Sequence, residues 1–224
     1  MYFPYLKSHT ILGLEGDTTT TVANIAAATA AYVAKELLLD TASAYGKGKY
    51  QDFYKAVAIA SVTTVHAAIT LPDTGTTVVT TGITDPGHYR CISIKGSAAG
   101  ITGDVVIVGT DWTGAVITDT LAANDDDTVV SEKAFMTVTS ITVPVKTTAA
   151  DTISVGVADV FGLTRPVAID TDVLYVGFAA NAVNASTFTY EDAASVDTDN
   201  NTVTLTTGIT ALDDLIIDFY ASAL

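Results

Sequence analysis

Apolar and polar residues alternate along most of this chain, from about residue 71 to the C-terminus. In one segment Ile92 and Ile94 alternate with Cys91, Ser93 and Lys95. An apolar side chain at every second position is typical of a β-strand that buries one of its faces. Segments rich in Val, Ile and Thr predict strands at residues 76–80, 89–95, 104–110, 115–121, 128–130, 135–144, 152–157, 173–178, 187–190, 202–207 and 215–220.

Turn-forming residues separate these segments at intervals of about ten residues. Residues 85–87 (DPG) and 124–127 (NDDD) are two such turns. Threonine, with 38 copies in 224 residues, suits the solvent-facing side of a sheet because it is β-branched and still polar. The predicted fold is mainly β, with an antiparallel β-sandwich or barrel-like domain at residues 71–224.

The first 70 residues follow a different pattern and predict an N-terminal arm with a helical extension. Residues 18–39 are rich in Ala, lack Gly and Pro, and can be capped by Asp17 or Thr18, so we expect a helix there. Residues 50–69 have helical spacing in their first half and strand-like spacing in their second. The sequence leaves the type of that segment open.

Two places carry aromatic side chains that could bind a partner. Tyr2, Phe3 and Tyr5 lie in the arm, where exposed aromatics are either tied into the fold or docked on another molecule. Trp112 lies beside Gly114 at the tip between two predicted strands, as an exposed anchor or as a packed side chain.

Composition narrows the classes of partner. The formal net charge is −15, with no basic patch, which disfavours nucleic acid and anionic membranes. Residues 22–39 are interrupted by polar and charged side chains, so we expect no transmembrane segment. Only 16% of residues are charged, which, with the high apolar content, suggests that much of the folded surface becomes covered by something else. The chain has a single Cys and no signal-peptide pattern, so we expect synthesis in a cytoplasm.

The sequence offers little material for catalysis. His9, His66 and His88 lie far apart with no spacing that pairs them, and we expect them to be structural or exposed. Cys91 begins an apolar strand and is expected to be buried. Glu191-Asp192 and Asp213-Asp214 are sequence neighbours, and neighbours on a strand point to opposite faces. We therefore expect no enzyme and no cofactor.

Two loops have partial resemblance to ligand-binding motifs. Residues 96–103 (GSAAGITG) lack the Lys of a phosphate-binding loop and precede a strand rather than a helix. Asp197, Asp199 and Asn201 have the spacing that opens a calcium loop, but the sixth position is Thr202 and the twelfth is Gly208. We interpret both segments as turns and expect no metal site, although carboxylates at the Asp-rich tips leave weak calcium binding open.

A series of motifs across residues 80–166 resembles β-rich structural proteins of tailed bacteriophages, of the kind encoded near the major capsid gene. The motifs are GITDP at 82–86, ITGDVVIVGTD at 101–111, VITDTLA at 116–122, KAFMTVTSITVP at 133–144 and AADTISVGVADVFGL at 149–163. The family usually has an Asn-Gly or Asp-Gly turn where this chain has NDDD at 124–127. Residues 1–70 match nothing in the family.

The resemblance implies a virion component, most like a capsid decoration (head cement) protein on the outer surface of a phage head. Its partners would be the major capsid protein and neighbouring copies of itself as a homo-oligomer on the particle, after assembly in the host cytoplasm. The arm could add a strand or aromatic anchors to an adjacent subunit. Two alternatives stay open: a tail, neck or fibre component, and a carbohydrate-binding module that uses Trp112.

Overall fold

β-Strands make up most of the part of the chain that the computed structural model describes, which comprises residues 47–148, 150–179, 189–191, 194–206, 208–209 and 213–222. The strands are β1 (Lys47–Val57), β2 (Ser61–Thr70), β3 (Thr77–Val79), β4 (Arg90–Gly96), β5 (Thr102–Thr110), β6 (Val116–Asn124), β7 (Thr128–Phe135), β8 (Thr137–Val143), β9 (Thr152–Gly162), β10 (Val173–Ala179), β11 (Thr189–Tyr190), β12 (Ser195–Asp197), β13 (Thr202–Thr204) and β14 (Asp213–Ser222). A single 3-10 turn, η1 (Asp170–Asp172), precedes β10. Residues Lys49–Ser222 belong to one compact unit.

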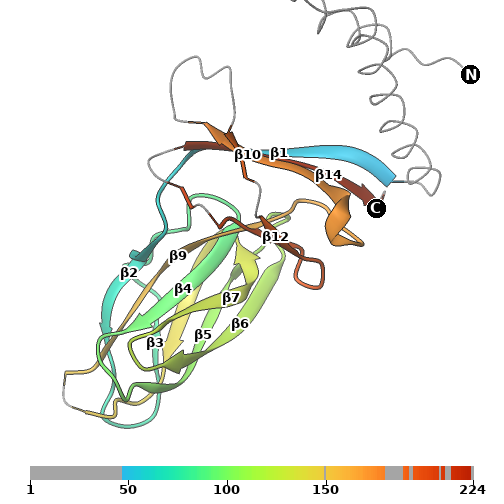
Figure 1. The fold of residues 1–224 in the computed structure, drawn as a ribbon. Coiled ribbons are helices and arrows are strands. Elements are labelled where there is room, and N and C mark those ends of the chain that lie inside the picture. The colour runs from blue at the N-terminus through green and yellow to red at the C-terminus, as the bar shows by residue number, and fades with distance from the viewer. Residues whose placement is uncertain are drawn as a thin grey trace, which may run out of the picture. The chain divides into compact units, whose positions relative to one another are not determined.

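The strands form three antiparallel sheets (Figure 1). Sheet A has the order β1-β14-β10-β11, and sheet C has the order β3-β8-β5-β6. Sheet B has the order β12-β13-β9-β4-β7, and β2 also pairs with β9. The long strand β9 is divided along one edge, because β2 pairs with residues 152–157 and β13 pairs with residues 160–162.

Strands β2 to β9 form a sandwich of two four-stranded sheets. One sheet has the order β2-β9-β4-β7 and the other β3-β8-β5-β6, and every neighbouring pair is antiparallel. Except at the β5–β6 hairpin, consecutive strands lie in opposite sheets. This is the strand order of an eight-stranded jelly roll, a fold built from two Greek keys.

Alternating apolar residues from both sheets fill the sandwich. Ile92 and Ile94 of β4 face Ile107 of β5 and Ile141 of β8 in one continuous core, and all four are almost fully buried. Burying an aliphatic side chain of this size contributes about 1.5–3 kcal/mol. The apolar residues that recur at every second position in the sequence are therefore the ones that point into the core.

One side of the sandwich is closed by side-chain hydrogen bonds rather than by a strand ladder. β6 and β7 are edge strands of different sheets, and Asp119 of β6 lies between them. Its Oδ2 accepts hydrogen bonds from the backbone N–H groups of Glu132 (2.8 Å) and Lys133 (3.2 Å). Lys133 Nζ donates in return to the carbonyl oxygen of Thr118 at 2.7 Å.

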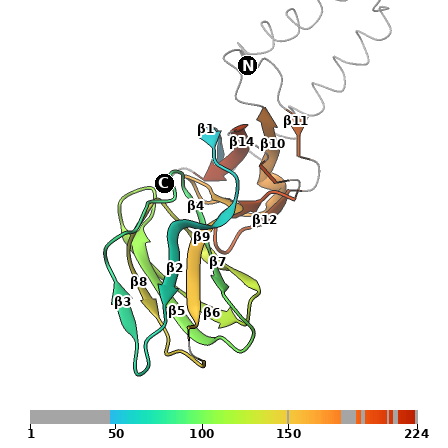
Figure 2. The same cartoon turned by 90° about the vertical axis from the view of Figure 1, so that its left-hand side faces the viewer.

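A second core lies between sheet A and the end of the sandwich at which β4 begins (Figure 1, Figure 2). Leu215, Ile217 and Phe219 of β14 pack there with Phe161 of β9 and Val203 of β13, and each of them is fully buried. β9 thus contributes side chains to both cores.

Arg90 is fully buried at the junction of the two cores. Its Nε donates to the carbonyl oxygen of Ala158 at 2.8 Å, one Nη to that of Ala58 at 2.9 Å, and the other Nη to Asp159 Oδ1 at 2.8 Å. The guanidinium carbon lies 4.7 Å from the centre of the Phe161 ring. The β1–β2 connection and β9 are therefore joined through one cation.

The structure confirms a mainly β chain of antiparallel sheets. The segment at 50–69, which the sequence left open, belongs to two strands, β1 and β2, that pair with β14 and β9. The compact unit accordingly starts at Lys49, whereas the sequence pattern changes near residue 70. The predicted helix at 18–39 and the aromatic arm lie outside the described residues.

Candidate functional site

The outer face of sheet C carries almost no charge. Hydrogen-bond register aligns Val78, Thr142, Val106 and Thr120 in one row across all four strands. Two further rows continue the face: Ser140, Val108 and Thr118, followed by Thr137, Thr110 and Val116. These ten residues are five threonines, four valines and one serine, and we call them the Thr–Val face.

The direction of the Thr–Val face follows from the core on the other side of the sheet. Val105 and Ile107 of β5 are fully buried in the sandwich, so Val106 and Val108 between them point outward. The most exposed valines of the face are Val116 at 75% and Val78 at 59%. Valine on the solvent side of an antiparallel strand is unusual, because that side normally carries polar residues.

Hydroxyl and methyl groups dominate the chemistry of this face. Thr110 Oγ1 and Thr137 Oγ1 are hydrogen-bonded at 2.7 Å, and Thr139, at a bulge in β8, donates to the carbonyl oxygen of Val108 at 3.1 Å. The nearest carboxylate on the outer side of β5 is Asp104, one row beyond the face. The face can therefore make apolar contacts and hydrogen bonds between neutral groups. It would repel neither positively nor negatively charged partners.

Trp112 lies at one end of the Thr–Val face, in the tight turn between β5 and β6, and is 40% exposed. Asp111 fixes this turn, because its Oδ1 accepts hydrogen bonds from the N–H groups of Thr113 (2.8 Å) and Ala115 (3.0 Å). Burial raises the pKa of Asp111, but hydrogen bonds from the Thr113 hydroxyl and from backbone N–H groups of the turn together lower it below its usual value. The indole is therefore carried by a rigid, ionised turn rather than by a loose loop.

Met136 extends the apolar end of the face. It is 42% exposed, and its N–H donates to the carbonyl oxygen of Thr110 at 2.7 Å. Val116 is paired with the same Thr110 from the other side. Two exposed apolar side chains thus flank Thr110, and Trp112 follows it by two residues.

The other residues considered from sequence have structural surroundings. Cys91 is fully buried, and burial raises the pKa of its thiol to about 12. Burial and the nearby Arg90 charge lower the pKa of His88, whose ring makes an edge contact with Tyr54. Asp197 accepts hydrogen bonds from the N–H groups of Asp199 and Asn200, so this segment is a capped turn.

Tyr2, Phe3 and Tyr5 lie outside the described residues, so the structure does not bring them to the Thr–Val face or separate them from it. In the described part of the chain, no three His, Cys, Asp or Glu side chains are grouped as a metal site would need. Nor does that part include a helix long and apolar enough to cross a bilayer.

The sequence pattern predicts the strands of the Thr–Val face but not the face itself. Its signal was present in the alternation: Val106 and Val108 occupy positions where an exposed strand would carry polar residues, and no Lys, Arg or Glu interrupts the Thr residues around them. Comparison with known proteins adds no assignment, because no family model, curated protein or solved structure matches this chain.

Proposed function

We propose that this protein is a structural component of a tailed-bacteriophage particle, and specifically a decoration protein that binds the outer surface of the head. The Thr–Val face carries this proposal, with Trp112 at its end. Interface centres are depleted in charged residues and enriched in aromatic residues and Met. A chain of net charge −15 that keeps one whole sheet face neutral has a surface suited to being covered.

The strand order of the sandwich gives a second, weaker support. Jelly rolls recur in viral capsid proteins, although they also occur in lectin domains and cupins. Fold likeness alone does not assign a function. The jelly-roll strand order is compatible with the phage-like motifs at residues 82–163, whose described residues lie in the strands and turns of the sandwich and its continuation into the second core.

The size of the Thr–Val face indicates how it would be used. Each outward-facing residue of a sheet occupies about 4.8 Å by about 6.8 Å, so the ten residues of the face cover about 330 Å². A stable pairwise interface buries about 800 Å² on each partner. One contact through this face is therefore weak, and affinity would come from many copies that bind a repeating surface and one another.

A particle-binding assay tests the proposal. Purified virions of the phage that encodes the protein should contain it in near-stoichiometric amounts relative to the major capsid protein, by quantitative mass spectrometry. Particles that lack it should rebind the purified protein, and Thr120→Lys should reduce rebinding at least about tenfold, because it places a charge at one edge of the otherwise neutral Thr–Val face. Thr63→Lys, an exposed threonine on β2 in sheet B, is the matched control.

Other results would lead to different conclusions. A few to a few dozen copies per particle would favour a tail, neck or fibre component. Absence from virions would refute the proposal. In that case the exposed Trp112 favours a carbohydrate-binding module, for which a glycan array comparing the native protein with Trp112→Ala is the direct test.

A further inference from the structure

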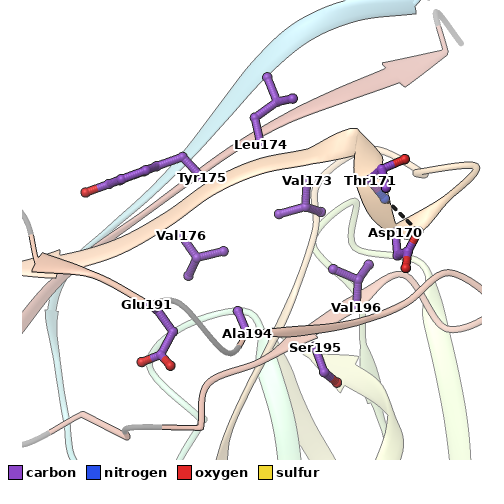
Figure 3. A pocket seen from close by; sticks show the side chains of 10 residues that line it. All are labelled: Asp170, Thr171, Val173, Leu174, Tyr175, Val176, Glu191, Ala194, Ser195 and Val196. Atoms are coloured by element: carbon purple, nitrogen blue, oxygen red, sulfur yellow. Dashed lines mark hydrogen bonds between the residues drawn. The ribbon is translucent and has the colours of Figure 1, made fainter.

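A hollow of about 410 Å³ lies between β10, η1 and β12, away from the Thr–Val face (Figure 3). Its volume is within the range of pockets that hold small ligands. The residues that line it lie at 170–171 and 173–176 on one side, and at 191 and 194–196 on the other. Both stretches belong to the same compact unit.

Small aliphatic side chains form the floor of the hollow. Val173 and Val176 of β10 and Ala194 and Val196 near β12 all point into it in Figure 3. Val176 is buried, but the other three are only half-buried. The floor can therefore gain contacts if an aliphatic chain lies along it.

Carboxylates lie at the two ends of this floor. Glu191 is 3% exposed, and its Oε1 accepts a hydrogen bond from Thr206 Oγ1 at 2.7 Å. Asp170 lies at the opposite end in Figure 3 and accepts a hydrogen bond from the N–H of Thr171 at 2.8 Å. No lining residue is basic, and the sequence contains no Lys or Arg after Arg165.

We propose that this hollow binds a cationic group carried on an aliphatic stem, such as the side chain of Lys or Arg or a free polyamine. The stem would lie on the valine floor, in the way that Lys and Arg stems cover apolar surface while their heads stay polar. The ammonium or guanidinium group would donate charge-assisted hydrogen bonds to a carboxylate. This inference does not depend on the proposed role in phage particles.

The negative charge of the site selects against the other ligand classes. An anion would meet two carboxylates and no basic lining residue. A divalent cation needs several oxygen ligands in close reach, and no group of three acidic, His or Cys side chains occurs among the residues that the structure describes. A monovalent organic cation needs only one carboxylate and gains from the apolar floor.

An NMR titration of the full chain with agmatine, which carries a guanidinium and an ammonium group at the two ends of a four-carbon stem, tests the proposal. We expect saturable shifts of the amide signals of Val173, Val176 and Val196. N-(4-Hydroxybutyl)urea has a similar shape with both charged groups replaced by neutral ones and is the matched probe. It should bind at least about tenfold more weakly, since hydrogen bonds between charged groups are the stronger ones. Equal affinity for the two probes, or no shifts at these valines, would overturn the proposal.

Variants identify the group that binds the cation. Glu191→Gln should weaken agmatine binding about tenfold, and Asp199→Asn, an exposed acidic residue outside the hollow, should leave it unchanged. If Glu191→Gln does not fold, Val196→Phe keeps the test open, because a larger side chain on the floor should abolish binding without removing charge. Unchanged affinity in the folded variants would refute the assignment.

Two further probes distinguish the sources of the cation. The peptide Gly-Gly-Arg-Gly-Gly presents the same guanidinium from a protein backbone, and spermidine presents ammonium groups without one. Tighter binding of the peptide than of agmatine would identify a partner's side chain as the ligand. Tighter binding of spermidine would identify a free polyamine.

Discussion

The buried Arg90 allows a sharp test of what holds the two cores together. Substituting Asp159 by Ala removes the only carboxylate bonded to the guanidinium among the described contacts, at 2.8 Å, and leaves two carbonyl acceptors and the Phe161 ring. Breaking one partner of a buried ion pair costs about 3–5 kcal/mol, because the remaining charge is left in a poorly solvating environment.

The lower end of that range applies here. The Asp159 side chain is 19% exposed, so water can replace part of its interaction, whereas Arg90 has no exposure. We therefore expect Asp159→Ala to lower the free energy of unfolding by about 3 kcal/mol. In a domain of this size that corresponds to a fall in Tm of about 6–12 °C.

Urea denaturation followed by circular dichroism measures this change, with Asp104→Ala as the control on an exposed strand position. Hydrogen exchange adds a spatial readout. Because the Arg90 contacts lie beside the second core, amide protection in β14 should fall more than protection in β5. A loss below about 0.5 kcal/mol for Asp159→Ala would refute the reasoning, since that is the effect of an ordinary surface substitution.

Three further predictions concern single side chains. Hydrogen bonds from two neighbouring threonines lower the pKa of Asp151 to about 2. Its contribution to stability is therefore complete above about pH 4 and is lost as the pH falls towards 2; Asp151→Asn should flatten the dependence of the urea midpoint on pH in this window. Burial raises the pKa of Cys91 to about 12, so the native thiol should not react with Ellman's reagent at about pH 8 but should react fully once unfolded. Gly156→Ala should cost about 3 kcal/mol or more, measured by urea denaturation, because a Cβ there would overlap the carbonyl oxygen of Ser61. Gly114→Ala, with no atom within 4 Å of the new Cβ but a positive φ, should cost only about 1 kcal/mol.

Most strands could be predicted because apolar and polar residues alternate strictly along them. The predicted strand at 89–95 corresponds to β4, and the one at 104–110 lies within β5. The prediction failed where the alternation breaks. β7 contains a bulge at 131–133, where the Ile92 N–H donates to Ser131 Oγ instead of to a backbone carbonyl oxygen. The predicted strand therefore ended at residue 130, five residues before β7 ends.

The remaining differences between the predicted and the observed strands come from tertiary contacts. Residues 195–197 form β12 only because β13 lies beside them, and their sequence resembles that of a turn. β1 carries Asp52 and Tyr54 on its inner face, and neither signals burial in a sequence. Asp52 is buried because Thr164 donates two hydrogen bonds to its carboxylate, and the Tyr54 hydroxyl donates to the carbonyl oxygen of Gly162.

The candidate binding face was not predictable from residue types alone. Five threonines and four valines spread over four strands become one surface only through the register of sheet C. The sequence placed Trp112 at a tip between two strands and left it open as an exposed anchor or a packed side chain, and in the structure it is 40% exposed.

The position of β9 in the chain has a consequence for synthesis on the ribosome. This strand pairs with β2, β4 and β13 and supplies side chains to both cores, yet it is the last strand of the sandwich to be made. Until residue 162 has left the exit tunnel, β2 and β4 have no common partner and their inner faces remain open. Folding of the sandwich must therefore wait for nearly three quarters of the chain, and the nascent protein exposes its strand edges throughout that interval.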